Sequence, residues 1–208
     1  MFGRCHVEDP RDQKFKLRRI STDRLTRYWS SRYFGNQGQE PSCVGFAWMH
    51  WLEASPISQY VLGGGIYKLA QYLDEWQGQN YEGTSVRAGA KALSHLGFIK
   101  EYRWATKIAP VISAVLETGP VVIGIDWREG MLETNKNGFI KPTGKIVGGH
   151  AILIDGVNKE KGFVRLKNSW GKDWGQKGRA KLKFDDLQTL LSHQGEACLG
   201  IERKPPKN

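Results

Sequence analysis

The stretch NQGQEPSCVGF, residues 36–46, places a cysteine six residues after a glutamine, where a polar loop gives way to an apolar helical pattern. Ser42 is a residue type that caps helices, so we expect Cys43 in the first helical turn. The partial positive charge of a helix N-terminus favours a thiolate there. The alternative is an ordinary buried cysteine. The stretch therefore raises the question whether Cys43 is a nucleophile served by the loop before it.

The sequence on either side of this stretch has two kinds of pattern. From Ser42 to about residue 118 the pattern is helical, with glycines and prolines at the helix ends. After Pro120, short segments rich in branched residues and bounded by glycines indicate strands. The expected helices cover 42–54, 58–76, 84–97, 110–119 and 185–194, and the expected strands cover 120–126, 149–157, 162–170, 178–184 and 196–202. A helical first half followed by mostly antiparallel strands predicts an α+β fold of two lobes.

The length and composition suit one domain of this kind. A chain of 208 residues can bury a sizeable core, and no apolar run approaches the roughly 18–20 residues that span a bilayer. We expect a basic N-terminal segment at 1–35, a mainly helical lobe at 36–118, a β-rich lobe at 119–202 and a disordered basic tail at 203–208. The N-terminus lacks the apolar middle of a secretion signal, which favours a cytoplasmic location where the chain is made.

The net charge of +10, from 31 Lys+Arg against 21 Asp+Glu, makes nucleic acid, a membrane surface or an acidic protein candidate partners. Basic residues are densest at 11–32, but aromatic residues do not alternate with them and no nucleic-acid-binding motif is present. We therefore interpret this region as a solvated basic face and expect no specific nucleic acid and no membrane span. The three cysteines lack the spacing of a zinc site, so no metal or other cofactor is expected.

A nucleophilic thiol needs a proton acceptor, and His150 is the candidate. It follows two glycines and opens the apolar strand AILID, so a stiff element would hold its imidazole. His50 is a poorer choice because it lies about 10 Å farther along the same helix. Asn168, at the end of another expected strand, can accept the second N–H of His150 and fix its tautomer, and Trp170 can cover that hydrogen bond. The alternatives are a hydrogen-bonded strand histidine and tryptophans that only pack.

The order Gln37, Cys43, His150 and Asn168 resembles the papain family of cysteine peptidases. The matching motifs are NQG at the glutamine, GHA at the histidine and NSWGxxWGxxG at the asparagine, and the resemblance extends over about residues 36–198. It implies a papain-like two-lobe fold, with a helical N-terminal lobe, an antiparallel β-sheet C-terminal lobe and a cleft between them. It also implies a thiol peptidase that hydrolyses peptide or protein substrates through a thioester acyl-enzyme at Cys43.

The resemblance assigns a role to each matching position. Cys43 is similar to the nucleophile, His150 to its base and later acid, and Asn168 to the residue that orients the histidine. The Gln37 amide and the Cys43 backbone N–H resemble the oxyanion hole, and Trp170 resembles the shield over the Asn–His hydrogen bond.

Substrate contacts follow from the resemblance as well. Thr84 resembles the edge that binds substrate backbone. Val86, Gly124 and Ala151 fall near the positions that line the family's main specificity pocket. If these assignments hold, the pKa of Cys43 is expected well below the roughly 8.5 of a free thiol.

Some residues depart from the family pattern. Glu40 stands where a disulfide cysteine is usual, Pro41 replaces a flexible glycine, and Val44 replaces an aromatic residue.

The spacing of the site residues also departs from the family pattern. His150 lies 107 and Asn168 125 residues after Cys43, a shorter spacing than is usual in the family. The shortening implies trimmed loops and resembles the disulfide-free bacterial or phage-like members. We expect Cys198 to be a packed core thiol and Cys5 an exposed one.

Other functions stay open from the sequence. A papain-like scaffold could act as a binding or structural component, within a larger assembly, with weak or no turnover. Acyl transfer other than peptide hydrolysis is a third reading, and nucleic-acid binding based on charge alone is a fourth.

Overall fold

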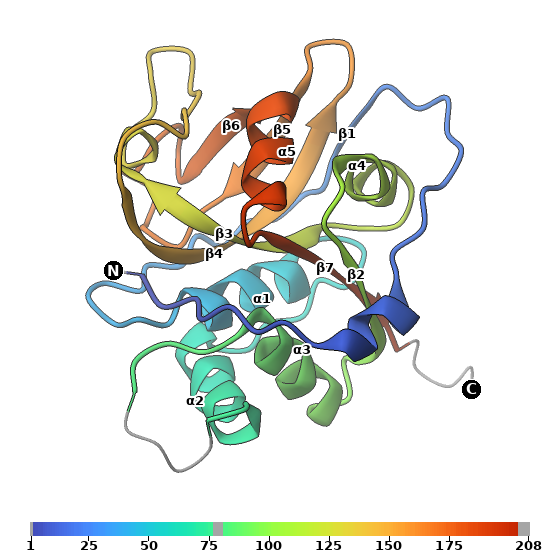
Figure 1. Cartoon of the computed structure of the whole chain (residues 1–208), viewed down its shortest axis with the longest axis vertical. Helices are drawn as coiled ribbons and strands as arrows, with labels where there is room; N and C mark the ends of the chain where they lie inside the picture. Colours follow the sequence, from blue (N-terminus) through green and yellow to red (C-terminus); the bar gives the residue numbers. More distant parts are fainter. Residues whose placement is uncertain (1, 77–80, 204–208) are drawn as a thin grey trace.

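The computed structural model describes residues 2–76 and 81–203, and its strands form one seven-stranded sheet (Figure 1). The strand order is β2–β7–β3–β4–β5–β6, and β1 pairs with β4 beside this path. The strands are β1 Thr26–Tyr28, β2 Ile99–Ala105, β3 Val121–Arg128, β4 Ile146–Asn158, β5 Phe163–Lys167, β6 Arg179–Lys183 and β7 Glu196–Glu202. All strand pairs of the sheet are antiparallel. The expected tail lies outside the described residues from position 204 onward.

Five α-helices accompany the sheet within the described ranges. They are α1 Cys43–Glu53, α2 Gly63–Leu73, α3 Val86–His95, α4 Ile108–Glu117 and α5 Phe184–Ser192, with two short 3₁₀ helices, η1 Pro10–Phe15 and η2 Glu129–Met131. In the part of the chain that the structure describes, no helix has the length and apolar character needed to cross a membrane.

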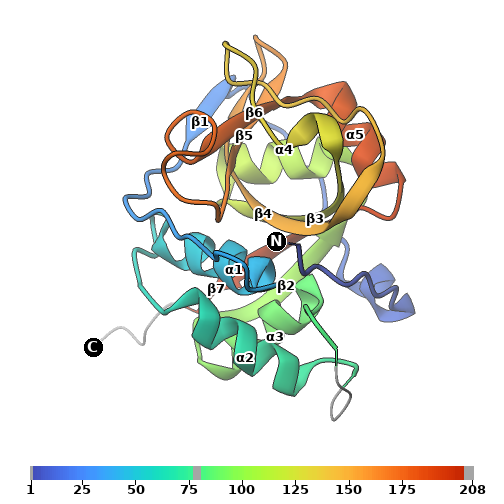
Figure 2. The same ribbon diagram turned by 90° about the vertical axis from the view of Figure 1, so that its left-hand side faces the viewer.

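The helices divide between two hydrophobic cores. One core lies under α1, α2 and α3, and the other joins α4 and α5 to the sheet. Figures 1 and 2 show the first three helices gathered at one end of the molecule and the sheet with the other two helices at the opposite end. The predicted α+β fold, with a helical part and an antiparallel β part, is confirmed.

The expectation of an uninterrupted helical region up to residue 118 is wrong in one place. Residues 99–105 form β2, which pairs with β7 along its whole length, and Ile99 and Trp104 are buried. A short polar–apolar segment such as IKEYRWA has no strong period of its own, so pairing with the last strand decides its conformation. In addition, α4 packs in the core of the sheet rather than beside α1 to α3.

The register of β3, β4 and β7 separates two faces of the sheet. Gly124 on β3 lies opposite both Ala151 on β4 and Glu196 on β7, whereas Ile125 lies opposite His150. Directly paired residues point to the same face, and neighbours along a strand point to opposite faces. Ala151 therefore faces the core under α1 to α3, and His150 shares its face with Ile125 of the other core.

Candidate active site

Cys43 is the first residue of α1, as predicted, and is fully buried. The side chain of Ser42 makes no capping hydrogen bond, so the helix start depends on packing more than on a cap. The backbone N–H of Ala151 on β4 donates to the Cys43 Sγ atom at 3.4 Å. This contact brings the start of a helix from one core against a strand of the other, one residue from His150.

The imidazole of His150 is held by Asn168. Nε2 of His150 and Oδ1 of Asn168 are 2.8 Å apart, and the same Oδ1 accepts the backbone N–H of Ser169 at 2.8 Å. The asparagine atom is therefore an acceptor, and Nε2 of the histidine must donate to it. This leaves the lone pair on Nδ1, a buried atom with no hydrogen-bond partner among the described residues. His150 is thus set up to accept a proton at Nδ1.

Two tryptophans enclose the His150–Asn168 hydrogen bond. The Trp170 ring lies 5.0 Å from the His150 ring, as expected for a shield, and Trp127 meets the imidazole edge-on at 4.8 Å. The sequence reasoning missed Trp127. The signal was present, because Trp127 follows Ile125 by two residues on β3 and so shares the face of His150. Both rings exclude water from the imidazole.

The side chain of Gln37 lies beside the start of α1 and has a fixed orientation. Its Nε2 donates to the Glu40 carbonyl at 2.7 Å, and its Oε1 accepts the Ser169 hydroxyl at 2.6 Å. Ser169 thus binds both Gln37 and the oxygen of Asn168. Sequence reasoning did not single out Ser169, because a serine next to a site asparagine has no distinctive pattern.

The first residues of the chain cover this site. In this covering segment, residues 2–6, the N–H groups of Gly3 and Arg4 both donate to the Gly149 carbonyl, at 3.1 and 3.0 Å. On the other side, Thr84 donates to the Gly3 carbonyl and accepts the N–H of Cys5, each at 2.9 Å. Figure 2 shows the N-terminus between β4 and α1. The segment therefore bridges the two cores at the position of Cys43.

The Phe2 side chain lies over the imidazole. Its ring packs edge-on against His150 at 5.8 Å and against Trp170 at 5.9 Å. Together with Gly3, it helps to bury both the thiol and the imidazole, which have no exposed surface.

Burial makes both groups of the site uncharged. It raises the pKa of Cys43 to about 11, although the N–H groups of Ala151, Gly3 and Val44 oppose this rise. Burial also lowers the pKa of His150 to about 4, although the hydrogen bond to Asn168 opposes the fall. Loss of water disfavours a thiolate and an imidazolium alike.

The expectation of a Cys43 pKa well below that of a free thiol is therefore wrong for this structure. The effect of the helix N-terminus is smaller than the cost of removing the sulfur from water. The thiol and the imidazole are therefore both neutral while residues 2–6 cover them.

The four residues expected to contact substrate lie around the covering segment. Thr84 makes the backbone contacts described above, and the N–H of Ala151 reaches the sulfur. Gly124 lies against the side chains of both Arg4 and Val86, since a Cβ placed on it would lie 2.8 Å from Arg4 Nε and from Val86 Cγ2. Their roles toward a substrate stay a prediction.

The cysteines are free thiols in the structure. Cys198 is buried in the core, as expected. Cys5 is half-buried rather than exposed, and its Sγ lies 3.6 Å from the Glu82 carbonyl oxygen. Burial raises the pKa of Cys5 as well, with the Asp74 carboxylate adding to the rise.

Comparison with known proteins gives a family match over most of the chain. Residues 37–195 match the family described as papain family cysteine protease. The chain is 39% identical over 80 residues to a cathepsin B-like cysteine proteinase 3 of Ostertagia ostertagi. That match covers 37% of this chain and only 45% of the relative. Zingipain-1 of Zingiber officinale is 25% identical over 153 residues, covering 69% of this chain and 67% of the relative.

Solved structures share the fold at low sequence identity. Xylellain, a cysteine protease from Xylella fastidiosa, superposes with a TM-score of 0.79 at 18% identity, covering 98% of this chain and 96% of that one. A Carica candamarcensis cysteine protease solved in complex with E-64 gives a TM-score of 0.59 at 15% identity, covering 87% of this chain and 100% of the other.

Proposed function

Because this chain belongs to the papain family of cysteine proteases, we propose that it is a cysteine peptidase that hydrolyses peptide bonds through a thioester acyl-enzyme at Cys43. One observation carries the proposal. The Asn168 oxygen holds Nε2 of His150 as a donor, which leaves Nδ1 able to take the proton of the thiol. His50 also has a buried Nδ1 without a partner among the described residues, so the unpaired atom alone does not identify a base. What distinguishes His150 is that the Cys43 sulfur accepts the N–H of Ala151, the next residue on the same strand.

The proposed reaction has one imidazole accept and release a proton twice, once in acylation and once in deacylation. His150 takes the thiol proton as the Cys43 sulfur attacks the substrate carbonyl, and the oxyanion receives N–H groups of Gln37 and Cys43. The imidazolium then gives its proton to the leaving amine as the C–N bond breaks, which leaves a thioester. Water next loses a proton to His150 and attacks the thioester. The imidazolium returns that proton to the sulfur as the C–S bond breaks, which releases the acid and restores the thiol.

A second candidate function is a binding or structural component with little turnover. The observation that favours it is the complete burial of Cys43 and His150 by residues 2–6. We favour the peptidase, because a covering segment explains the burial. A scaffold gives no reason for a thiol at a helix start to contact Ala151, next to a histidine that Asn168 orients. The proposed substrates are peptides or proteins. A larger assembly and a cytoplasmic location where the chain is made stay predictions.

Trapping of the acyl-enzyme tests the peptidase proposal. The wild-type chain and an Arg4→Ala variant, which removes the buried cation of the covering segment, are mixed with a peptide p-nitrophenyl ester and quenched in acid. Peptide mapping by mass spectrometry should place an acyl group on Cys43, and both proteins should cleave members of a peptide library. An acyl group on Cys5 in place of Cys43, or a library left intact by both proteins, would contradict the proposal.

Replacement of Ser169 by alanine should lower kcat about fivefold and leave the alkylation rate of Cys43 nearly unchanged. The hydroxyl fixes the Gln37 amide, and loss of one hydrogen bond typically costs about 1 kcal/mol. Alkylation by iodoacetamide forms no oxyanion, so it does not need that amide. Ser192→Ala is the matched control, because this serine lies at the end of α5 and its hydroxyl donates to the Gln188 carbonyl within that helix. Equal losses of turnover and alkylation in Ser169→Ala would show a general structural defect instead.

A further inference from the structure

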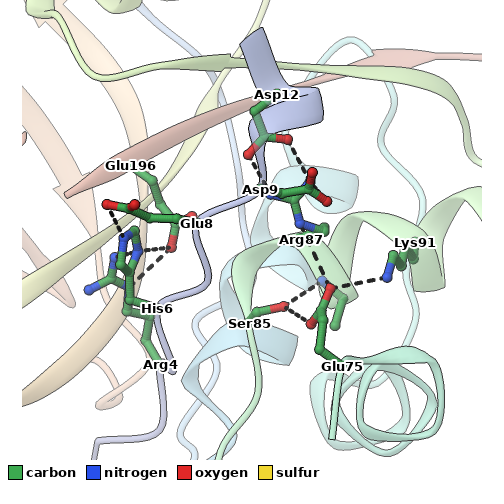
Figure 3. A network of polar contacts seen from close by, with 11 residues as sticks. Arg4, His6, Glu8, Asp9, Asp12, Glu75, Ser85, Arg87, Lys91 and Glu196 are labelled. Carbon is green, nitrogen blue, oxygen red and sulfur yellow. Dashed lines mark hydrogen bonds and ion pairs between the residues drawn. The ribbon is translucent and has the colours of Figure 1, made fainter. Parts of the chain in front are cut away.

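Arg4 of the covering segment places its guanidinium in a pocket that contains two carboxylates. Its Nε donates to Glu196 Oε1 at 3.1 Å, and its Nη1 lies 3.8 Å from Asp126 Oδ1. Figure 3 shows Arg4 and Glu196 side by side. The Arg4 side chain is only 2% exposed, and a buried charge is tolerated only when it is paired and hydrogen-bonded. The pocket supplies that pairing.

Further acceptors complete the surroundings of the guanidinium. Nη2 of Arg4 donates to Nδ1 of His6 at 2.8 Å and to the backbone carbonyl of Gln194. A guanidinium is always a donor, so each of these atoms acts as an acceptor. Glu196 also borders a cavity of about 880 Å³ that His6 and Gln194 help to line. The pocket therefore opens toward free space rather than ending in the core.

The fold of the sheet accounts for the shape of this pocket. Glu196 on β7 lies opposite Gly124 on β3, and Asp126 follows Gly124 by two residues on the same face. A Cβ on Gly124 would lie 2.8 Å from both Arg4 Nε and Glu196 Oε1, and also from Val86 Cγ2. Glycine at this position leaves the volume that the guanidinium occupies. Val86 provides an apolar wall beside the charged groups.

The backbone that carries Arg4 passes directly beside the candidate nucleophile. Arg4 donates its N–H to the carbonyl of Gly149, the residue before His150. The segment runs so close to the protein that a Cβ on Gly149 would lie 2.3 Å from the Arg4 carbonyl oxygen, and a Cβ on Gly83 would lie 2.3 Å from the Gly3 carbonyl oxygen. Glycines at both positions make room for an extended peptide backbone. A side chain in the pocket therefore belongs to a peptide that passes Cys43.

We propose that Glu196 and Asp126 form a specificity pocket for an arginine or lysine side chain of the peptide substrate, and that Arg4 fills this pocket as an intramolecular occupant. This proposal rests on the proposed peptidase function, and it adds a class of substrate. Selection follows from charge, because an uncharged side chain in the pocket would leave the buried Glu196 carboxylate and the partly buried Asp126 carboxylate without the guanidinium.

Peptide binding tests the pocket independently of catalysis. The probe is a fluorescently labelled peptide with the sequence of residues 2–6, and its partner carries leucine in place of the arginine. Fluorescence anisotropy with the Arg4→Ala protein, in which the occupant lacks its cation, should show the arginine peptide binding about 10–100-fold more tightly, as expected for hydrogen bonds to a charged group. Adding Glu196→Gln should remove most of this preference, and adding Glu160→Gln, an exposed carboxylate in a turn, should not.

Cleavage of a positional peptide library gives the second readout. The Arg4→Ala protein should prefer arginine or lysine at one position of the substrate, and Glu196→Gln in that background should reduce the preference over leucine by about 10–100-fold. Binding or cleavage without a basic preference would overturn the pocket and leave the peptidase function intact. Preferential binding of the arginine peptide without any cleavage would overturn the peptidase function and keep the pocket. No binding of either peptide would also overturn the pocket.

Discussion

Replacing His150 by alanine is expected to lower kcat by roughly 10⁴–10⁶, the largest loss from a single site residue other than the nucleophile. The imidazole is the group in the proposed reaction that moves protons, and its Nδ1 is buried and has no hydrogen-bond partner among the described residues. Steady-state assays with a fluorogenic peptide, using Arg4→Ala as the parent protein, measure the loss. KM should change far less than kcat, because the imidazole acts mainly on the reacting atoms.

A matched control separates this effect from the removal of any histidine. His95 is exposed at the end of α3, and His95→Ala should retain parental activity. Circular dichroism should show both variants folded. A His150→Ala protein that keeps more than about a tenth of the parental kcat would exclude His150 as the general base. Proton transfer alone typically contributes 10²–10⁴, and the larger loss expected here includes activation of the nucleophile, with which the base acts as a unit.

The sequence predicted the fold wherever a segment had a strong period or clear end signals. Gly97 has a positive φ of 82° just beyond α3, and Ser85 caps the start of that helix by accepting the N–H of Ala88. Both signals lie within a few residues of the element they define. Strand β2 could not be predicted in the same way, because its partner is the last strand of the chain and its own alternation is weak.

The residues of the candidate site divide in the same way, into those that a local sequence motif identifies and those that only contacts distant in the sequence bring to the site. Gln37, Cys43, His150 and Asn168 stand in recognisable motifs, and the structure brings them together. Glu196 stands in no such motif. Its importance comes from lying directly opposite Gly124 on the neighbouring strand. Such a register appears only after the sheet has formed.

The position of the covering segment, like that of Glu196, depends on contacts between residues distant in the sequence. Its effect on the pKa of Cys43 is the largest departure from the sequence-based expectation. Its contacts with Gly149 and Thr84 join residues more than 75 positions apart, so no sequence window contains them. A helix N-terminus argues for a thiolate only while water reaches the sulfur. Once residues 2–6 exclude water, burial dominates, and the pKa of Cys43 moves upward to about 11. Displacement of the segment is therefore expected to favour the charged thiolate–imidazolium pair.

The second large effect is expected at the oxyanion. Gln37→Ala should lower kcat by roughly 10²–10³, the cost typical of removing one oxyanion donor. The Gln37 amide is held in place by both ends, since its oxygen accepts the Ser169 hydroxyl and its nitrogen donates to the Glu40 carbonyl. Preorganised donors are effective because they need no rearrangement when charge develops on the substrate oxygen.

Comparison with alkylation gives the Gln37 variant its diagnostic value. Iodoacetamide reacts with the sulfur without forming an oxyanion, so Gln37→Ala should alkylate Cys43 within about threefold of its Arg4→Ala parent while its turnover falls by roughly 10²–10³. Gln39→Ala, an exposed neighbour in the same loop, should change neither rate. If alkylation falls as far as turnover, Gln37 supports the position of Cys43 instead of the transition state. If neither falls, the oxyanion must be bound by other groups, because a donor that can be deleted without loss does not stabilise the developing charge.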